Sequence, residues 1–216
     1  MSQPLIYVSC YIKPCPLQLN LILYLVLHSC YYPQYIQIKA AELVASDNFN
    51  EKMEQKFFSL YDKILNYRFP PSEGVDVCPQ WLVSDSRRLD DFTTSFAIEL
   101  NQHPLLLVEI KPSSDFQYDS GCNGAILQVL NCLDEIGPKN LHADRLYAIS
   151  AIGKRWRACF SLKGNSSQGG QPVMGVTKKL SLSSAHPECW NPDITSDASY
   201  IAFQGIVDTI KSYIAQ

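Results

Sequence analysis

The sequence predicts a mixed α/β (α+β) domain in which a four- to five-stranded sheet is flanked by helices. Apolar residues recur with helical spacing in three segments, 51–68, 124–136 and 199–215. Runs rich in β-branched, aromatic or leucine residues lie between these segments and are bounded by turn residues. Of the 216 residues, 46% are hydrophobic and 18% are charged, which is the balance of a globular chain and not of a disordered one.

The first strong helical signal is the segment 51–68. Its apolar positions follow a helical period, and Pro70-Pro71 ends it because proline cannot continue a helix. Before this helix we expect a short helix or connector at 40–50. After it we expect a loop at 72–79 and a short strand at 81–84.

A β-hairpin follows. The segment 91–100 is rich in Phe, Thr and Ile, and 105–111 is a nearly continuous apolar run, so both are predicted strands. The turn residues at 101–104 lie between them and predict an antiparallel pair.

The second half of the chain continues the alternation of helices and strands. A polar loop at 113–123 leads to a helix at 124–136, which Gly137-Pro138 closes. Later elements are two strands, a flexible Gly/Ser/Gln-rich stretch and a final helix capped by Ser196, Asp197 or Ser199. We place them at 146–152, 155–162, 164–172 and 199–215.

The N-terminal region has a different character. Residues 1–45 are assigned to an apolar arm and 46–216 to the domain itself. The apolar run 17–27 is shorter than the roughly 20 residues of a membrane-spanning helix, so no membrane association is expected. A core strand or packing arm, a signal or anchor, and a poorly ordered extension all remain open for this region.

Cysteine usage and charge bear on compartment and partners. The eight cysteines have neither the spacing of a disulfide framework nor that of a zinc site, which favours an intracellular protein, nuclear or cytoplasmic. Secretion stays open because 165–167 forms a glycosylation sequon. The net charge of −3 excludes a strongly basic nucleic-acid binder but not a local basic surface, and the sequence gives no oligomeric state.

The candidate site lies at the end of the apolar run. Glu109 and Lys111 are spaced i and i+2 on a strand, so their side chains share a face. A hairpin turn at Asn101 and Gln102 would bring Asp91 opposite Lys111, and a slip of one residue would bring Asp90 there instead. Two carboxylates and a lysine at one strand end can hold a divalent cation and orient a water molecule.

These residues resemble the PD-(D/E)XK nuclease superfamily, most closely small fungal proteins of that superfamily. The resemblance is carried by Asp90-Asp91-Phe92, by LLLVEIKP at 105–112, by a following helix with a glutamine, and by YAISAIGKRWRA at 147–158. It implies a restriction-endonuclease-like core. One departure is Asp90, which stands where the family usually has a proline before the motif aspartate.

The resemblance also implies residue roles. Asp91 and Glu109 would be the metal ligands for Mg²⁺ (or Mn²⁺), and Lys111 would position or deprotonate the attacking water. Gln128 would border the site from the helix. Glu54, with Glu51 as the alternative, would be the glutamate of the first helix.

The expected function is therefore a metal-dependent nuclease that hydrolyses phosphodiester bonds of DNA or RNA. A catalytically inactive nuclease-fold module that binds nucleic acid or a protein partner is the alternative, and an effector-like protein directed by its N-terminal arm is a third. Five basic residues could touch nucleic acid or simply lie on surface turns: Arg87, Arg88, Lys154, Arg155 and Arg157.

Overall fold

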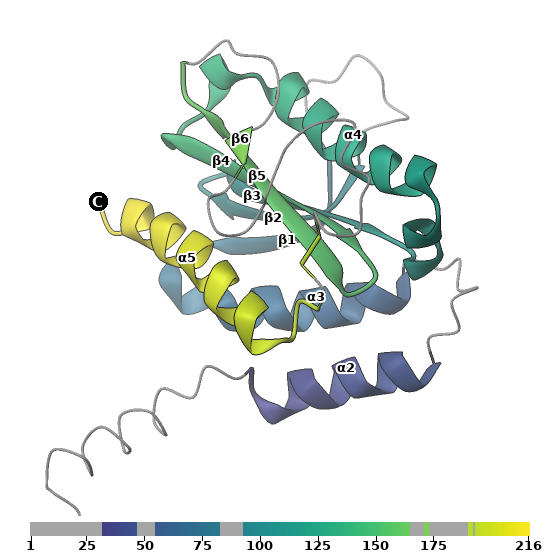
Figure 1. The fold of residues 1–216 in the computed structure, drawn as a ribbon. Helices are drawn as coiled ribbons and strands as arrows, with labels where there is room; N and C mark the ends of the chain where they lie inside the picture. Colours follow the sequence, from purple (N-terminus) through teal and green to yellow (C-terminus); the bar gives the residue numbers. More distant parts are fainter. Residues whose placement is uncertain (1–31, 47–54, 83–92, 165–170, 173–189, 192) are drawn as a thin grey trace, which may run out of the picture. The chain divides into compact units, whose positions relative to one another are not determined.

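The structure is a computed structural model that describes residues 32–46, 55–82, 93–164, 171–172, 190–191 and 193–216 (Figure 1). The chain divides into two units, Met1–Cys30 and Tyr31–Gln216, and every described residue belongs to the second. None of the helices in the described ranges is long and apolar enough to cross a bilayer.

The described elements form one mixed sheet with helices on both faces, which confirms the predicted class. Its strands follow one another in chain order, and every neighbouring pair is antiparallel except β3 and β4, which are parallel. In chain order the elements are α2 (Gln34–Ser46), α3 (Gln55–Arg68), β1 (Asp76–Leu82), β2 (Thr93–Leu100), β3 (His103–Lys111), α4 (Asp119–Ile136), β4 (Arg145–Ile152), β5 (Arg155–Leu162), β6 (Gln171–Pro172) and α5 (Asp197–Ile214).

Figure 1 shows α3 and α5 on one face of the sheet and α4 on the other. The α3/α5 face carries the larger core, which includes Phe96, Val108 and Trp156. The α4 face carries a smaller core, which includes Leu107 and Ala148. Side chains alternate between the two faces along each strand, so β3 and β4 are apolar on both sides, as their uninterrupted hydrophobic runs indicate.

Several element boundaries differ from those expected from the sequence; helix α2, for example, begins at Gln34, six residues before the expected start at 40. Strand β1 begins at Asp76, inside the segment predicted to be a loop, because an edge strand tolerates a proline such as Pro79. Helix α4 begins at Asp119, five residues before the predicted start at 124. An aspartate in the first turn of a helix is favourable because it faces the positive end of the helix dipole.

The hairpin between β2 and β3 is antiparallel and turns at Asn101 and Gln102, as predicted, and it also contains a bulge. Asn101 (φ 52°) and Gln102 (φ 66°) form a two-residue turn of the type that suits tight hairpins. A bulge between Ile98 and Glu99 then shifts the pairing by one residue, so Phe96 lies opposite Val108. Three further residues along each strand bring Thr93 to the level of Lys111. The predicted pairing of Lys111 with Asp91, or with Asp90, involves residues outside the described ranges.

A buried arginine joins three helices. Arg68 at the end of α3 is 4% exposed, and its guanidinium lies 3.7 Å from the ring centre of Tyr200 on α5 and 4.9 Å from that of Tyr32, just before α2. It also donates hydrogen bonds to the Gln204 side chain and to the Tyr200 carbonyl oxygen. Within the described residues, every hydrogen-bond and ring partner of Arg68 is uncharged at neutral pH.

Candidate active site at the end of strand β3

Glu109 is a buried carboxylate near the end of an apolar strand. Its side chain is 5% exposed, and its Oε1 atom lies 3.1 Å from the Nζ atom of Lys111, whose side chain is 23% exposed. The Oε2 atom accepts a hydrogen bond of 3.3 Å from the backbone N–H of Ser95 on β2. The predicted juxtaposition of Glu109 and Lys111 on one face of β3 is thus present, with the lysine on the solvent side.

The carboxylate belongs to a row of polar side chains on the α4 face. Glu109 lies opposite Ser150 on β4, and Ser150 lies opposite Arg157 on β5. Ser95 reaches the same level from β2, where its hydroxyl accepts the N–H of Ile110 at 3.0 Å. The hydroxyl of Ser150 donates to the carbonyl of Ala125 on α4 at 3.0 Å, so α4 is tied to the sheet at this row.

The strands β2 and β3 separate at this level. Their backbone ladder ends at the pair Phe96 and Val108, and beyond it the contacts run through the side chains of Ser95 and Glu109. A strand that leaves its neighbour exposes backbone and side-chain polar groups that would otherwise be paired. The polar side chains of Ser95 and Glu109 thus take over the pairing between the two strands at this level.

Several predicted site residues lie outside the described ranges. They are Glu51, Glu54, Arg87, Arg88, Asp90 and Asp91. Gln128 is described, and it is half-buried on α4 between the sheet-facing positions Ala125 and Val129. The structure therefore brings together two of the five residues proposed for catalysis, Glu109 and Lys111.

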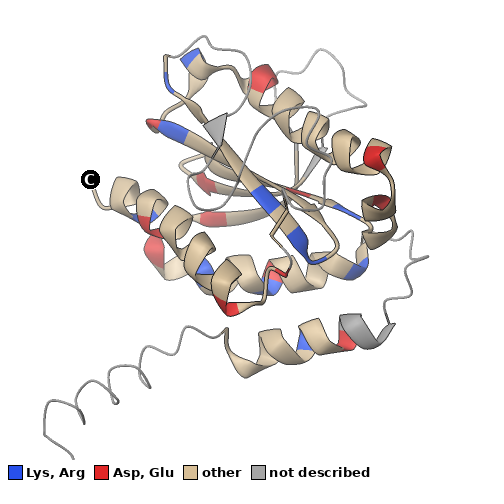
Figure 2. Cartoon of the chain, in the orientation of Figure 1, with Lys and Arg blue, Asp and Glu red and all other residues tan. Residues whose placement is uncertain are grey.

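The predicted basic contacts on the β4–β5 hairpin have distinct environments. Lys154 pairs with Asp193, with 2.5 Å between the Nζ and Oδ2 atoms. Arg157 is 3% exposed, and Arg155 is half-buried (Figure 2 shows basic segments along β5). Trp156 is fully buried on the opposite face and donates to Ser199 at 2.9 Å, so it is a core residue and not part of a surface patch.

The aromatic rings that lie beside Arg155 and Arg157 are those of Phe116 and Trp190, not that of Trp156. The guanidinium of Arg155 lies 4.2 Å from the ring centre of Phe116, and that of Arg157 lies 5.7 Å from the ring of Trp190. The Phe116 and Trp190 rings meet edge to face at 6.1 Å. Sequence reasoning did not identify either ring, because both lie in loops far from β5 along the chain.

Cys122 lies beneath this cluster, on the first turn of α4. Burial raises the pKa of its thiol to about 11, while the positive charges of Arg155 and Arg157 act in the opposite direction. The thiol therefore stays protonated at neutral pH and is a poor nucleophile. Cysteine-based catalysis, which the sequence did not indicate, has no support at this position.

The carboxylate at this site is the type of ligand that a hard divalent cation prefers. Mg²⁺ is bound in proteins through one or two carboxylates together with water and substrate phosphate. Glu109 supplies one carboxylate among the described residues, and within those ranges no three His, Cys, Asp or Glu side chains gather into a metal-binding group. Asp91, the second ligand implied by the resemblance, lies outside the described ranges.

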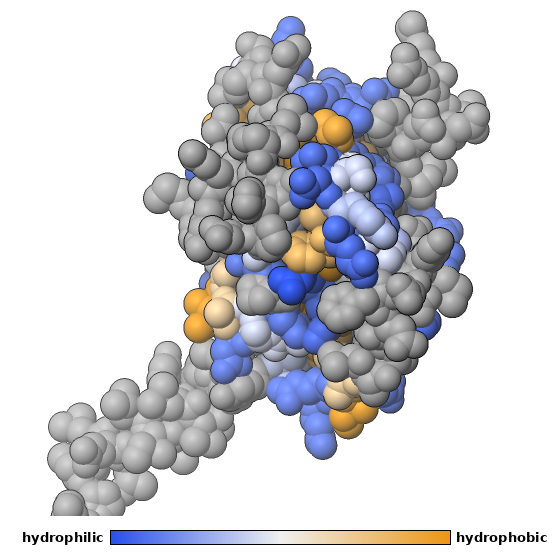
Figure 3. Space-filling view, turned by 45° about the vertical axis from the view of Figure 1, so that its right-hand side comes forward, coloured by the Kyte–Doolittle hydropathy of each residue, from blue (hydrophilic) through white to orange (hydrophobic). Residues whose placement is uncertain are grey.

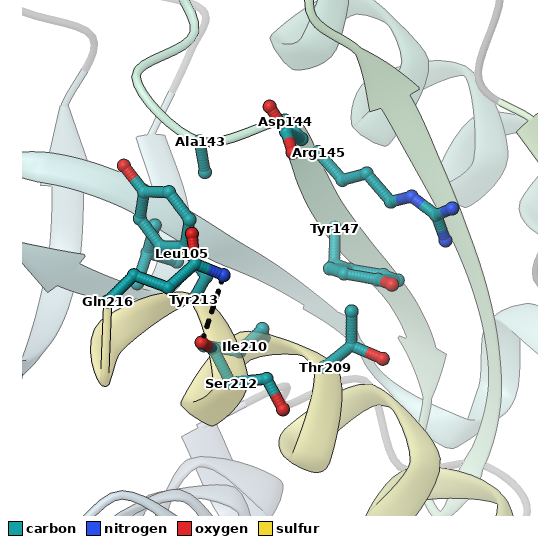
Figure 4. Close-up of a pocket in the computed structure, with 10 residues that line it drawn as sticks. All are labelled: Leu105, Ala143, Asp144, Arg145, Tyr147, Thr209, Ile210, Ser212, Tyr213 and Gln216. Carbon is teal, nitrogen blue, oxygen red and sulfur yellow. Dashed lines mark hydrogen bonds between the residues drawn. The ribbon is translucent and has the colours of Figure 1, made fainter.

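A cavity of about 420 Å³ lies elsewhere, at the opposite edge of the sheet (Figure 4). Leu105 and Tyr147, near the starts of β3 and β4, line it together with Ile210 and Tyr213 of α5. The cavity lies at the N-terminal ends of the parallel strands β3 and β4, whereas Glu109 and Lys111 lie at the C-terminal end of β3. The cavity is therefore separate from the candidate site. Figure 3, which shows another view, has only small apolar patches set among hydrophilic residues on its visible face.

Comparison with known proteins adds no relative to this description. No protein-family model matches the chain, and neither a curated protein nor a solved structure shows a significant match to it.

Proposed function

We propose that this chain is a metal-dependent nuclease of the PD-(D/E)XK type, with a restriction-endonuclease-like core, that hydrolyses phosphodiester bonds. The single observation that carries the proposal is the buried carboxylate of Glu109 with the Lys111 ammonium 3.1 Å away at a strand end. Removing a carboxylate from water is costly, and structural ion pairs are mostly found at the surface. A buried carboxylate paired with a partly exposed lysine at a strand end is the kind of arrangement that functional sites use.

The order of elements supports the same proposal. Helix α3 precedes three antiparallel strands, and α4 connects β3 to the parallel strand β4. The sequence resemblance has the Glu-x-Lys pair near the end of the strand that follows a tight hairpin, and a glutamine on the next helix. Lys111 ends β3, and Gln128 lies on α4.

Each residue has a role that its environment suits. Ser95 holds Glu109 in place through its backbone N–H. Lys111, partly open to solvent, offers its ammonium to the negative charge that develops on a phosphate oxygen during attack. Glu109, joined by Asp91 under the resemblance, would hold Mg²⁺ or Mn²⁺, and the chemistry that such an ion supplies is the activation of water at neutral pH.

Cleavage assays on the full chain test the proposal. Labelled single- and double-stranded DNA and RNA are incubated with magnesium, with manganese and with a chelator. We expect metal-dependent cleavage that Lys111→Ala and Glu109→Gln each reduce by at least about 100-fold. The matched control is Lys211→Ala, which removes the partner of Glu73 on the other side of the sheet and should leave cleavage unchanged. Equal cleavage by Lys111→Ala and the parent chain would contradict the proposal.

A second candidate function is a catalytically inactive nuclease-fold module that binds nucleic acid or a protein partner. The observation that favours it is that both oxygens of Glu109 have protein partners, Lys111 and the Ser95 N–H. Titration calorimetry with magnesium separates the two candidates. The inactive module predicts neither cleavage nor heat of metal binding, whereas the nuclease predicts both, and Glu109→Gln removes them together.

A further inference from the structure

The loop that follows β3 presents aromatic side chains beside the candidate site. Phe116 is half-buried in this loop, and the Arg155 guanidinium lies 4.2 Å from its ring centre. Tyr118, two residues further along, is 62% exposed, which makes it the most exposed large hydrophobic residue in the described ranges. We call Phe116, Tyr118 and Arg155 the stacking platform.

The platform lies next to Lys111 by connection and by register. Only four residues separate Lys111 from Phe116 in the chain. In the sheet, Lys111 lies opposite Ile152, which lies opposite Arg155, so the two cations share a face and are two strands apart. Strand spacing puts their backbones about 10 Å from each other. A ligand that touches Lys111 can therefore also reach Arg155.

The part of the platform formed by Phe116 is held in place from behind. Trp190, 4% exposed, packs edge to face against Phe116, and Arg157 lies near the Trp190 ring. A ring and a guanidinium that are fixed in this way lose little conformational entropy when a flat ligand stacks on them. Tyr118, by contrast, leaves most of its surface in water, so its ring is accessible to a ligand.

We propose that the stacking platform binds an unpaired nucleobase, so that the substrate at Lys111 is single-stranded nucleic acid. This inference rests on the proposed function for the presence of a phosphate at Lys111. In a duplex each base is covered by its neighbours, and aromatic platforms are useful only for bases that are unstacked. Both aromatic rings and arginine planes stack on bases of single strands.

The local charge predicts how such binding depends on salt. Asp115 and Asp119 flank the platform in the sequence, and among the described residues Lys111 and Arg155 are the cations that the register brings to its level, so we count two phosphate contacts. Two phosphate contacts on a single strand correspond to a slope of about −1.4 in a plot of log K against log salt. Stacking, which is insensitive to salt, supplies the remaining affinity.

Fluorescence anisotropy on the full chain tests the inference without relying on cleavage. The probe is a fluorescein-labelled oligothymidylate or oligouridylate in chelator, and unlabelled duplex of the same length is the competitor. We expect Tyr118→Ala to raise Kd by about 5- to 150-fold, the range for losing one stacked base. Phe116→Leu keeps an apolar side chain but removes the ring, and Arg155→Lys keeps the charge but removes the planar guanidinium. Each should therefore also weaken binding. Tyr35→Ala removes another exposed tyrosine, 50% exposed on α2, and should change nothing.

The outcomes separate this inference from the proposed function. Single-strand binding that Tyr118→Ala weakens, in a chain that does not cleave, supports the platform and refutes the nuclease. Magnesium-dependent cleavage with equal affinity for duplex and single strand, or with unchanged binding by Tyr118→Ala, refutes the platform and leaves the nuclease standing. A slope much steeper than −1.4 likewise overturns it, because binding would then be general phosphate attraction.

Discussion

Replacing Lys111 by methionine should destabilise the protein by an amount that the buried pair determines. Unit charges 3.1 Å apart attract by about 5 kcal/mol at an effective dielectric constant of about 20. Breaking a fully buried pair by removing one partner costs about 3–5 kcal/mol, because the other charge stays buried. Since the Lys111 side chain is 23% exposed, water can partly replace it, and we expect a loss near the lower limit, about 3 kcal/mol.

Denaturant and thermal unfolding, followed by circular dichroism, measure this loss. For a chain of this size a change of 3 kcal/mol lowers Tm by about 6–12 °C. Adding Glu109→Gln to Lys111→Met should restore most of the stability, because the amide oxygen can still accept the Ser95 N–H and the carboxylate charge that Lys111 balanced is gone. The double variant thereby separates charge burial from lost packing.

The control is the pair formed by Lys211 and Glu73, whose side chains are each 34% exposed. Lys211→Met should cost no more than about 1 kcal/mol, as partly exposed pairs do. If the free energy of unfolding of Lys111→Met lies within about 0.5 kcal/mol of that of the parent chain, the Glu109 carboxylate is solvated in solution. The reasoning about its burial then fails.

Three further predictions concern stability and can be checked by the same unfolding measurements. Burial raises the pKa of the Cys159 thiol to about 12, so between pH 9 and 12 only the unfolded state loses this proton. Stability should therefore fall as pH rises, by about 1.4 kcal/mol per pH unit, and Cys159→Ala should remove that part of the pH dependence. Gly121→Ala should destabilise α4 by about 1–3 kcal/mol, since the added Cβ would lie 2.2 Å from the Asp115 carbonyl oxygen. Gly124→Ala on the same helix, which meets nothing within 4 Å, should instead stabilise it by about 0.5–1 kcal/mol. Gln102→Gly should raise the free energy of unfolding by about 1 kcal/mol, because Gln102 has a φ of 66° that glycine adopts without strain. A loss of stability would show that this turn differs in solution.

The sequence predicts those parts of the fold that local patterns encode. The apolar run at the centre of β3 and the helical spacing of α3 each determine an element with little reference to the rest of the chain. The bulge between Ile98 and Glu99 could not be foreseen, because neither residue differs from an ordinary strand residue. This single insertion shifts the pairing of β2 with β3 by one residue between the turn and Phe96.

The candidate site was predictable to the extent that it lies within one strand. Alternation along β3 was sufficient to bring Glu109 and Lys111 to one face. Ser95 and Trp190 were not predictable, since one depends on the register of a neighbouring strand and the other on a loop that packs from a distant part of the chain. Long-range contacts of this kind leave no periodic signal in a single sequence.

The aromatic environment of Arg68 has a consequence for acid tolerance. Carboxylates in general are neutralised on acidification, and an arginine that depends on a carboxylate partner then loses its attraction. Arg68 instead meets the faces of Tyr32 and Tyr200, an amide oxygen and a main-chain carbonyl, none of which takes up a proton in mildly acidic solution. The contacts of Arg68 that join α2, α3 and α5 should therefore persist at a lower pH than ion pairs that need an ionised carboxylate.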